Sequence, residues 1–215
     1  MTKLLKKEFI LFTHPTSWMF LLFAAMMLIP GYPMYIPLFW ATLGLFYACI
    51  SARENNDLYY TLLLPVRKCD AVRARGLYFA LVELLQLAAC VPFAILRGAL
   101  KIGPNSAGMD VNVALFGLGL VLLGMFNLLF LPPLYKNPTA VGKPFLIVMI
   151  WVFVYIVAAE ACCFVVPFFR DVLDTPDPQH LGAKLVVLLV GAALFVLLTV
   201  LGTRRAEKIF EKVDL

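Results

Sequence analysis

The chain has 215 residues, of which 63% are apolar and 14% are charged. Soluble globular domains carry about 25% charged residues, so this chain has roughly half of the usual charge. A water-soluble fold of this length has too little interior to bury so many apolar side chains, and disordered chains lack its many aromatic and branched residues. The composition therefore excludes both classes and predicts a membrane protein.

A membrane-spanning helix needs about 20 mostly apolar residues. Four segments reach that length, and a further apolar stretch over residues 17–51 is interrupted by Pro30, Pro33 and Pro37. Because proline breaks a helix interior, this stretch predicts two short spans joined by a turn. We therefore expect one transmembrane domain over residues 1–215, an all-α bundle with spans at about 17–31, 34–51, 77–96, 113–134, 144–166 and 181–203.

The basic residues predict the orientation, because loops rich in Lys and Arg stay in the cytoplasm. Six spans with the N-terminus inside place 14 of the 18 Lys and Arg residues on the cytoplasmic side, together with both termini. We expect a multi-pass protein of the plasma membrane whose positive charge faces anionic inner-leaflet lipid. The net charge of +5 then requires no nucleic-acid partner.

Residues 1–14 carry three lysines on one side of a helix and apolar side chains on the other, with Glu8 interrupting that pattern. They predict a helix lying on the inner leaflet before Pro15 turns the chain, or simply a basic flank. The segment 167–180 contains Phe168, Phe169 and Val172 and predicts a second, shorter piece that touches the membrane.

Motifs for catalysis or nucleotide binding are missing from the sequence. It contains no G-x-x-x-x-G-K-[ST], H-E-x-x-H or G-x-S-x-G pattern. His14 and His180 fall on opposite sides of the expected topology, and the five cysteines show no C-x-x-C spacing. We therefore expect no catalytic residue, no bound metal and no cofactor held by this chain.

Four polar side chains lie inside the expected spans. An ionisable group there is costly unless it is paired, so it marks either a substrate pathway or a structural hydrogen bond between helices. Glu83 and Gln86 share a helix face, Glu160 lies near the outer end of the fifth span, and Asn127 can bond to a neighbouring helix. Both interpretations stay open for the set of possible pathway residues Glu83, Gln86, Asn127 and Glu160.

Small residues, which allow close helix contacts in lipid, recur in two spans. In the second span they are spaced four apart, and in the fourth they are glycines. They are Gly44, Ala48, Ala52, Gly117, Gly119 and Gly124.

Residues 52–76 form the longest cytoplasmic loop. Residues 56–63 predict a two-turn helix with Tyr59, Leu62 and Leu63 on one side, ended by Pro65. Asp70 is then expected to cap the helix that leads into the third span. Such a helix could lie on lipid or dock to a cytosolic partner.

The acidic and Asn cluster, the aromatics, the Leu-Leu-Pro-Val-Arg run and the basic helix start of residues 54–75 resemble small six-span ABC-2-type permease subunits. These are bacterial exporters, some of which secrete antimicrobial or amphipathic peptides. The resemblance implies a type V exporter-like bundle with an N-terminal interfacial helix, a cytoplasmic coupling helix and a re-entrant element before span six. It also implies separate ABC ATPase subunits that bind the ATP, and a homodimer or a heterodimer with a second permease.

In the permease subunits that this chain resembles, the corresponding loop is a coupling helix that inserts into a groove on the ATPase. We expect Tyr59 and Leu62 to be the buried anchors, with charged side chains at the rim. The predicted coupling residues are Glu54, Asp57, Tyr59, Tyr60, Leu62, Leu63, Arg67 and Lys68.

The expected function is ATP-driven export of a hydrophobic or amphipathic substrate such as a peptide, an antimicrobial or a lipid-like molecule. Two other classes remain as alternatives. An ion-coupled secondary transporter would need an ion or proton site such as Glu83 at mid-membrane. An intramembrane enzyme would need Glu83 and Glu160 to face each other.

Overall fold

The computed structural model describes residues 2–213, and over this range every regular element is a helix. Five helices are long and apolar enough to span a membrane, which confirms the all-α membrane fold. They are α3 (Ile36–Glu54), α5 (Lys68–Ala99), α6 (Val113–Lys136), α7 (Gly142–Val165) and α8 (Leu181–Phe210). The shorter elements are α1 (Thr2–Lys7), η1 (Glu8–Phe12), α2 (Pro15–Leu21), η2 (Leu22–Leu28), α4 (Asp57–Leu63) and η3 (Phe169–Leu173).

A sharp bend separates the two N-terminal helical segments. Thr2–Phe12 and Pro15–Leu28 meet at 89°, and the number of spanning helices rises from five to six if this pair is counted as one span. Pro15 stands in the first turn of α2, where its missing N–H costs nothing, and the His14 side chain accepts a hydrogen bond from the Thr16 N–H. Sequence and capping together therefore fix the place of the bend.

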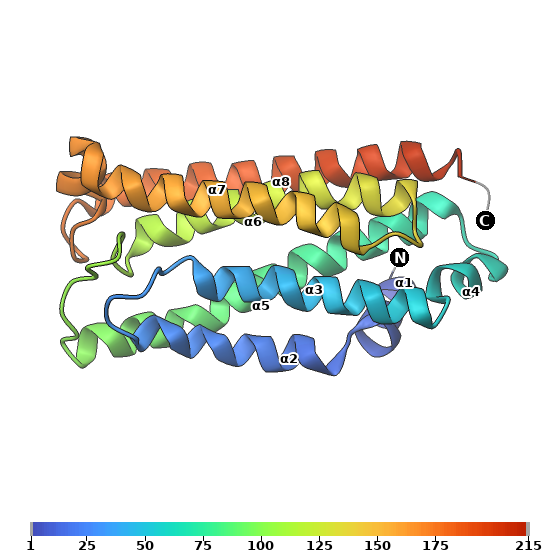
Figure 1. The fold of residues 1–215 in the computed structure, drawn as a ribbon, viewed down its shortest axis with the longest axis horizontal. Helices are drawn as coiled ribbons and strands as arrows, with labels where there is room; N and C mark the ends of the chain where they lie inside the picture. The colour runs from blue at the N-terminus through green and yellow to red at the C-terminus, as the bar shows by residue number, and fades with distance from the viewer. Residues whose placement is uncertain (1, 214–215) are drawn as a thin grey trace.

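Helix α1, α4 and the end of α8 lie at one end of the bundle, which we call the α4 end (Figure 1). Residues 100–112 and 166–180 lie at the opposite end, which we call the far end. The segment Pro15–Leu28 and helix α3 run side by side, and the Ser17 hydroxyl donates to the Gly44 carbonyl at 3.0 Å. The long helices therefore run from one of these ends to the other (Figure 1).

Helices α6 and α8 pack along their length, and glycines permit this close approach. A Cβ on Gly124 would come within 2.9 Å of the Phe195 Cα, and one on Gly202 within 2.7 Å of the Asn127 carbonyl. Gly117 and Gly191 face each other in the same crossing. The small residues of α6 were expected to mark a contact, whereas the matching glycines of α8 were missed.

Two expectations about boundaries are wrong. Asp70 does not cap α5, because the helix begins at Lys68 after Arg67, and Asp70 instead accepts a hydrogen bond from Arg67 Nε at 2.9 Å. The first proline-containing break is also wider than expected, since helix ends at Leu28 and resumes at Ile36. Pro33 and the left-handed Gly31, with φ of 67°, account for the turn between them.

Two glycines of α8 should change the thermal stability in opposite directions when each is replaced by alanine. Gly191→Ala should lower the thermal stability of the purified protein, because the new methyl group meets the Gly117 backbone and overpacking costs about 1–3 kcal/mol. Gly182→Ala should maintain or raise it, because nothing lies within 4 Å and alanine favours helix by up to about 1 kcal/mol. Equal melting temperatures for the two variants would contradict the close packing of α6 on α8.

Candidate functional site

Helix α4 is the short element that joins α3 to α5 at the α4 end. Asn56 reverses the chain with φ of 51°, a left-handed conformation that asparagine tolerates better than most residues. Leu64, which precedes Pro65, is extended, as expected before proline. Both ends of α4 are thus set by local sequence, and the helix is held across the base of the bundle.

A buried cluster of four charges holds α4 in place. Glu8 of η1 accepts from Arg75 Nε of α5 at 2.9 Å, and Arg75 Nη2 also donates to the Asp57 carboxylate of α4. Lys7 Nζ lies 2.7 Å from Asp57 and donates to the Thr61 hydroxyl at 2.9 Å. Two positive and two negative groups therefore balance, with their hydrogen-bonding capacity largely used inside the protein, as buried charges require.

Arg75 is the centre of this cluster. Its side chain is 8% exposed and its guanidinium lies 3.9 Å from the centroid of the Phe12 ring. Arginine suits this position because its planar group forms several fixed hydrogen bonds and stacks on aromatic faces. One side chain of α5 is thereby bound both to the N-terminal helix and to α4.

The charge of Asp57 is stable at neutral pH. Burial works to raise its pKa, but the charges and hydrogen bonds of Arg75 and Lys7 outweigh burial and hold the pKa below its ordinary value. A carboxyl whose folded pKa is lowered stabilises the fold above its unfolded pKa, and that contribution is lost as pH falls through the folded value. Asp57 should thus remain paired with Arg75 and Lys7 through the neutral range and lose its charge only in acid.

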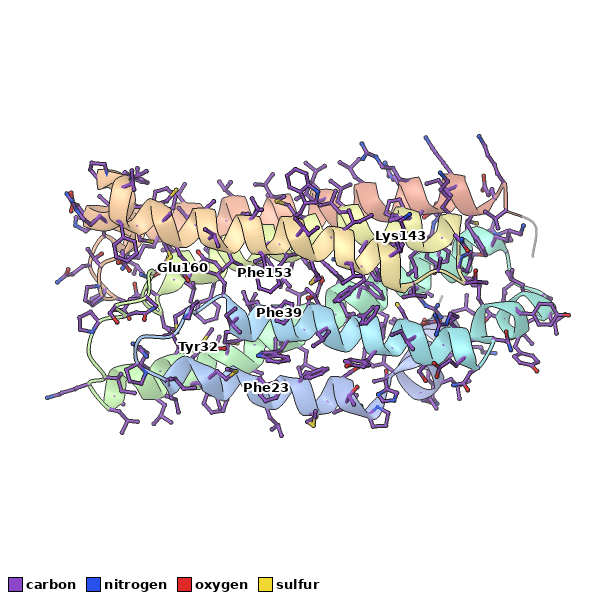
Figure 2. All side chains as sticks on the ribbon, in the orientation of Figure 1. Phe23, Tyr32, Phe39, Lys143, Phe153 and Glu160 are labelled. Carbon is purple, nitrogen blue, oxygen red and sulfur yellow. The ribbon has the colours of Figure 1, made fainter. Side chains whose placement is uncertain are left out.

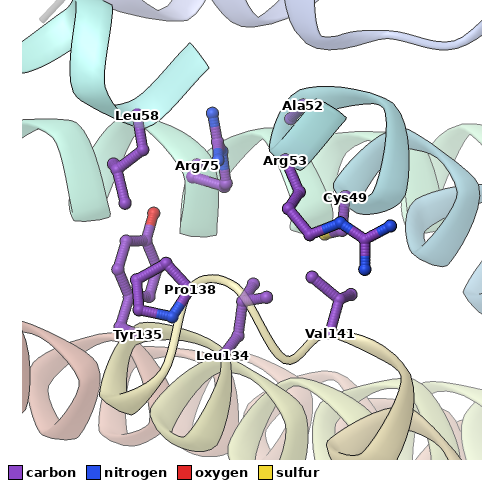
Figure 3. Close-up of a pocket in the computed structure, with 9 residues that line it drawn as sticks. All are labelled: Cys49, Ala52, Arg53, Leu58, Arg75, Leu134, Tyr135, Pro138 and Val141. Carbon is purple, nitrogen blue, oxygen red and sulfur yellow. The ribbon is translucent and has the colours of Figure 1, made fainter. Parts of the chain in front are cut away.

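A small cavity of about 40 Å³ lies beside the cluster. Figure 3 shows Leu58 of α4, Arg75 of α5 and Arg53 of α3 along one side of it and Tyr135 of α6 on the other. The Tyr135 hydroxyl is buried and has no hydrogen-bond partner among residues 2–213. Because Tyr135 lines this cavity, α6 also borders the polar region around Arg75. The cavity is large enough to hold a water molecule.

Helix α4 has two different faces. Tyr59, Tyr60 and Leu63 are 53%, 62% and 65% exposed, and they form what we call the outer face of α4. Leu58 and Leu62 pack against the core on the opposite side. An aromatic and apolar surface is thus presented away from the bundle by a helix whose other side is fixed to it.

The predicted arrangement of the coupling residues needs two corrections. Leu62 does not share the outer face with Tyr59, because it is half-buried against the bundle. Asp57 is not a rim charge, because it is bound by Lys7 and Arg75.

The other predicted rim charges lie at the α4 end but are held differently. Glu54 is exposed, and Arg67 pairs with Asp70. Lys68 donates to the Val213 carbonyl at 2.6 Å and lies 5.7 Å from the Phe210 ring centroid, so it ties α5 to the end of α8.

A second polar group lies within the bundle and joins three helices. Glu83 of α5 accepts a 2.6 Å hydrogen bond from Asn127 of α6, which also donates to Thr199 of α8 at 3.1 Å. Gln86 donates to the Pro37 carbonyl at 3.1 Å. Glu83, Gln86 and Asn127 are fully buried, and each of these contacts joins two helices.

Glu160 occupies a separate position near the far end (Figure 2). Its carboxylate accepts a 2.7 Å hydrogen bond from the Met109 N–H and lies against Gly108. Glu83 and Glu160 thus have different partners, and the structure does not bring them together as the paired acids that an intramembrane enzyme would need.

Sequence reasoning missed the charge cluster at the α4 end. Glu8 and Arg75 are far apart in sequence, and Arg75 was counted only as one of the basic residues near a span. The available signal was Glu8 itself, a carboxylate interrupting the apolar side of an otherwise amphipathic helix.

Comparison with protein families decides the class. A family model described as "ABC-2 family transporter protein" matches residues 3–210. The chain belongs to the ABC-2 transporter family. In this ABC-2 protein the match includes the N-terminal helix, α4 and all five long helices, which supports a multi-pass permease subunit of an ABC transporter and confirms the expected family. Neither the curated proteins nor the solved structures contained a match to the chain.

The charge cluster predicts that replacing two nearby arginines of α5 by leucine has very different effects on the stability of the protein. Arg75→Leu should destabilise the protein by about 3–5 kcal/mol, because it leaves Glu8 and Asp57 buried with fewer partners. Arg73→Leu removes a half-exposed pair with Glu207 and should cost far less than Arg75→Leu, because exposed ion pairs contribute little to stability. Thermal unfolding of both variants in one detergent measures this, and similar losses would contradict a central role for Arg75.

Glu83 can be tested by its neutral analogue. If its role is structural, Glu83→Gln should keep the melting temperature and the transport rate, because glutamine can accept the same hydrogen bond from Asn127. Glu83→Leu should lower the free energy of unfolding by about 1 kcal/mol, the usual contribution of an interhelical hydrogen bond in a membrane. Loss of transport by Glu83→Gln at an unchanged melting temperature would instead put Glu83 on the substrate pathway.

Proposed function

We propose that this ABC-2 protein is the permease of an ABC exporter and that α4 is the coupling helix to which a separate ATPase subunit binds. ATP is bound and hydrolysed by that partner, so this chain needs no cofactor of its own. The observation that carries the proposal is the two-sided character of α4, which is fixed to the bundle on one side and exposes Tyr59, Tyr60 and Leu63 on the other.

The outer face of α4 has the composition of a binding hot spot. Exposed aromatic and apolar side chains that become buried in a partner's groove supply most of the binding free energy, while rim charges mainly affect association rate. Tyr59 and Leu63 are the proposed anchors, and Glu54 and Arg67 lie at the rim. Tyr60, on the same face, widens the contact.

The charge cluster would transmit the movement of the ATPase. A displacement of α4 pulls on Asp57, which is bound to Arg75 of α5 and to Lys7 beside η1. Helix α5 has 32 residues and reaches the far end of the bundle, so a tilt imposed at Arg75 is carried to the opposite side of the membrane. The N-terminal helix moves with it through Glu8.

In this proposal the α4 end faces the cytoplasm of a cell whose plasma membrane holds the protein. The end of α8, α4 and the lysines of α1 are then on one side, next to anionic lipid.

Dimerisation with a second copy or with a related permease would cover the apolar face of α7, where Ile147, Ile150, Trp151 and Val154 are exposed. The proposed substrate is hydrophobic or amphipathic, because the spans offer few charges with which to select a polar solute.

The anchor assignment predicts which variants lose the partner. Tyr59→Ala combined with Leu63→Ala should abolish co-purification of an ABC ATPase with the tagged permease, since truncated anchors often cost about 2 kcal/mol or more each. Arg67→Ala should retain it, because this rim charge pairs with Asp70 and is largely exposed. Membrane yield should be unchanged in both. ATPase capture by the double variant at the wild-type level would contradict the assignment of α4.

A further inference from the structure

A large cleft lies at the far end, between the end of α5 and helices α6 and α8. Its volume is about 840 Å³, and the loop after α5 closes one side of it. The wall towards the middle of the bundle is apolar and comes from three helices. It is formed by Leu87, Val91, Ala94, Ile95, Phe116 and Leu188.

The polar residues of the cleft are confined to its mouth at the far end. Asp110 and Asn112 come from the loop before α6, and Asp177 comes from the loop before α8. The cleft is therefore layered in the same order as a lipid leaflet, with apolar walls at hydrocarbon depth and charges at the interface.

Water does not stably fill an apolar cleft that opens between membrane helices, so the occupant must itself be apolar at depth. Ligand sites of this volume are typically apolar with a few polar groups that fix orientation. We propose that the cleft binds an acyl chain of a phospholipid from the leaflet around the far end, with an amine-bearing headgroup at the mouth.

The charges at the mouth favour an ammonium group over an anion. Arg97 is 4% exposed, and its two terminal nitrogens donate to the Met27 and Gly103 carbonyls and to Asp110. Lys184 is fully buried and bound to Asp177. Neither cation is free to hold a phosphate.

The carboxylates at the mouth are more accessible than the cations. The Asp110 and Asp177 side chains remain 21% and 35% exposed. The charged residues that line the cleft are Asp110, Asp177 and Arg97, so two acids stand against one base. Phosphatidylethanolamine, whose headgroup ends in an ammonium, matches this charge better than phosphatidylglycerol does.

The test uses two alanines of the same helix. Ala94 lines the cleft, whereas Ala88 is exposed elsewhere on α5. The tagged protein is reconstituted with palmitoyl-oleoyl phosphatidylethanolamine, washed in detergent and weighed by native mass spectrometry. Wild type and Ala88→Phe should retain one lipid per chain. Ala94→Phe should retain it roughly tenfold more weakly, as expected if the ring displaces about two methylenes from the cleft.

A second variant separates loss of lipid binding from loss of folding. Gly98 lines the mouth and a Cβ there would meet nothing within 4 Å, so Gly98→Leu should fold normally and also lose the lipid. Phosphatidylglycerol offered at the same concentration should be retained more weakly than phosphatidylethanolamine.

Three results would overturn the proposal. The first is a wild type that keeps no lipid, and the second is equal retention by the Ala94→Phe and Ala88→Phe variants. The third is conversion of a dimer to a monomer by Ala94→Phe with unchanged lipid, since the cleft would then seat a second copy of the chain.

Discussion

The fold depends most on one buried side chain, Arg75. Burying a guanidinium costs several kcal/mol unless charged partners surround it, and here the partners come from two other segments of the chain. Glu8 and Asp57 can reach Arg75 only if the N-terminal helix turns back at Pro15 and α4 lies across the base of the bundle. The cost of burial therefore fixes the relative positions of three elements that apolar packing alone would leave free to slide.

The remainder of the bundle is built to be stiff. Glycines bring α6 and α8 into backbone contact, and Asn127 links Glu83 to Thr199 so that α5 is bonded to the same pair. In lipid, such close packing and hydrogen bonds replace the hydrophobic effect as the forces that hold helices together. A stiff bundle whose base is tied to α4 by buried charges is suited to move as a lever. The few contacts between α5 and α6 leave room for the cleft at the far end.

Sequence reasoning predicted the features that local patterns control. Hydropathy identified the long helices, prolines marked the bends, and the short helix before Pro65 followed from its own residues. The features it missed depend on contacts between distant segments. Nothing near Asp57 indicates that it turns inward to Lys7, and the helical spacing of Tyr59 and Leu62 cannot tell which of them faces the bundle. Asp70 was misplaced because Arg67 competes for its carboxylate. The glycines of α8 acquire meaning only when α6 is opposite.

If movement of α4 reaches the far end through the charge cluster, breaking the cluster should abolish that movement, and a distance between α5 and α8 can report it. Spin labels at Gly98 and Gly182, on a background without native cysteines, report the separation of α5 and α8 at the far end in the permease–ATPase complex. ATP should change this distance in the otherwise unaltered chain. Asp57→Asn weakens the pairing with Lys7 and Arg75 but leaves the outer face of α4 intact, so the ATPase should still bind while the change in distance disappears. An ATP-driven change of the same size in the Asp57→Asn complex would contradict the account.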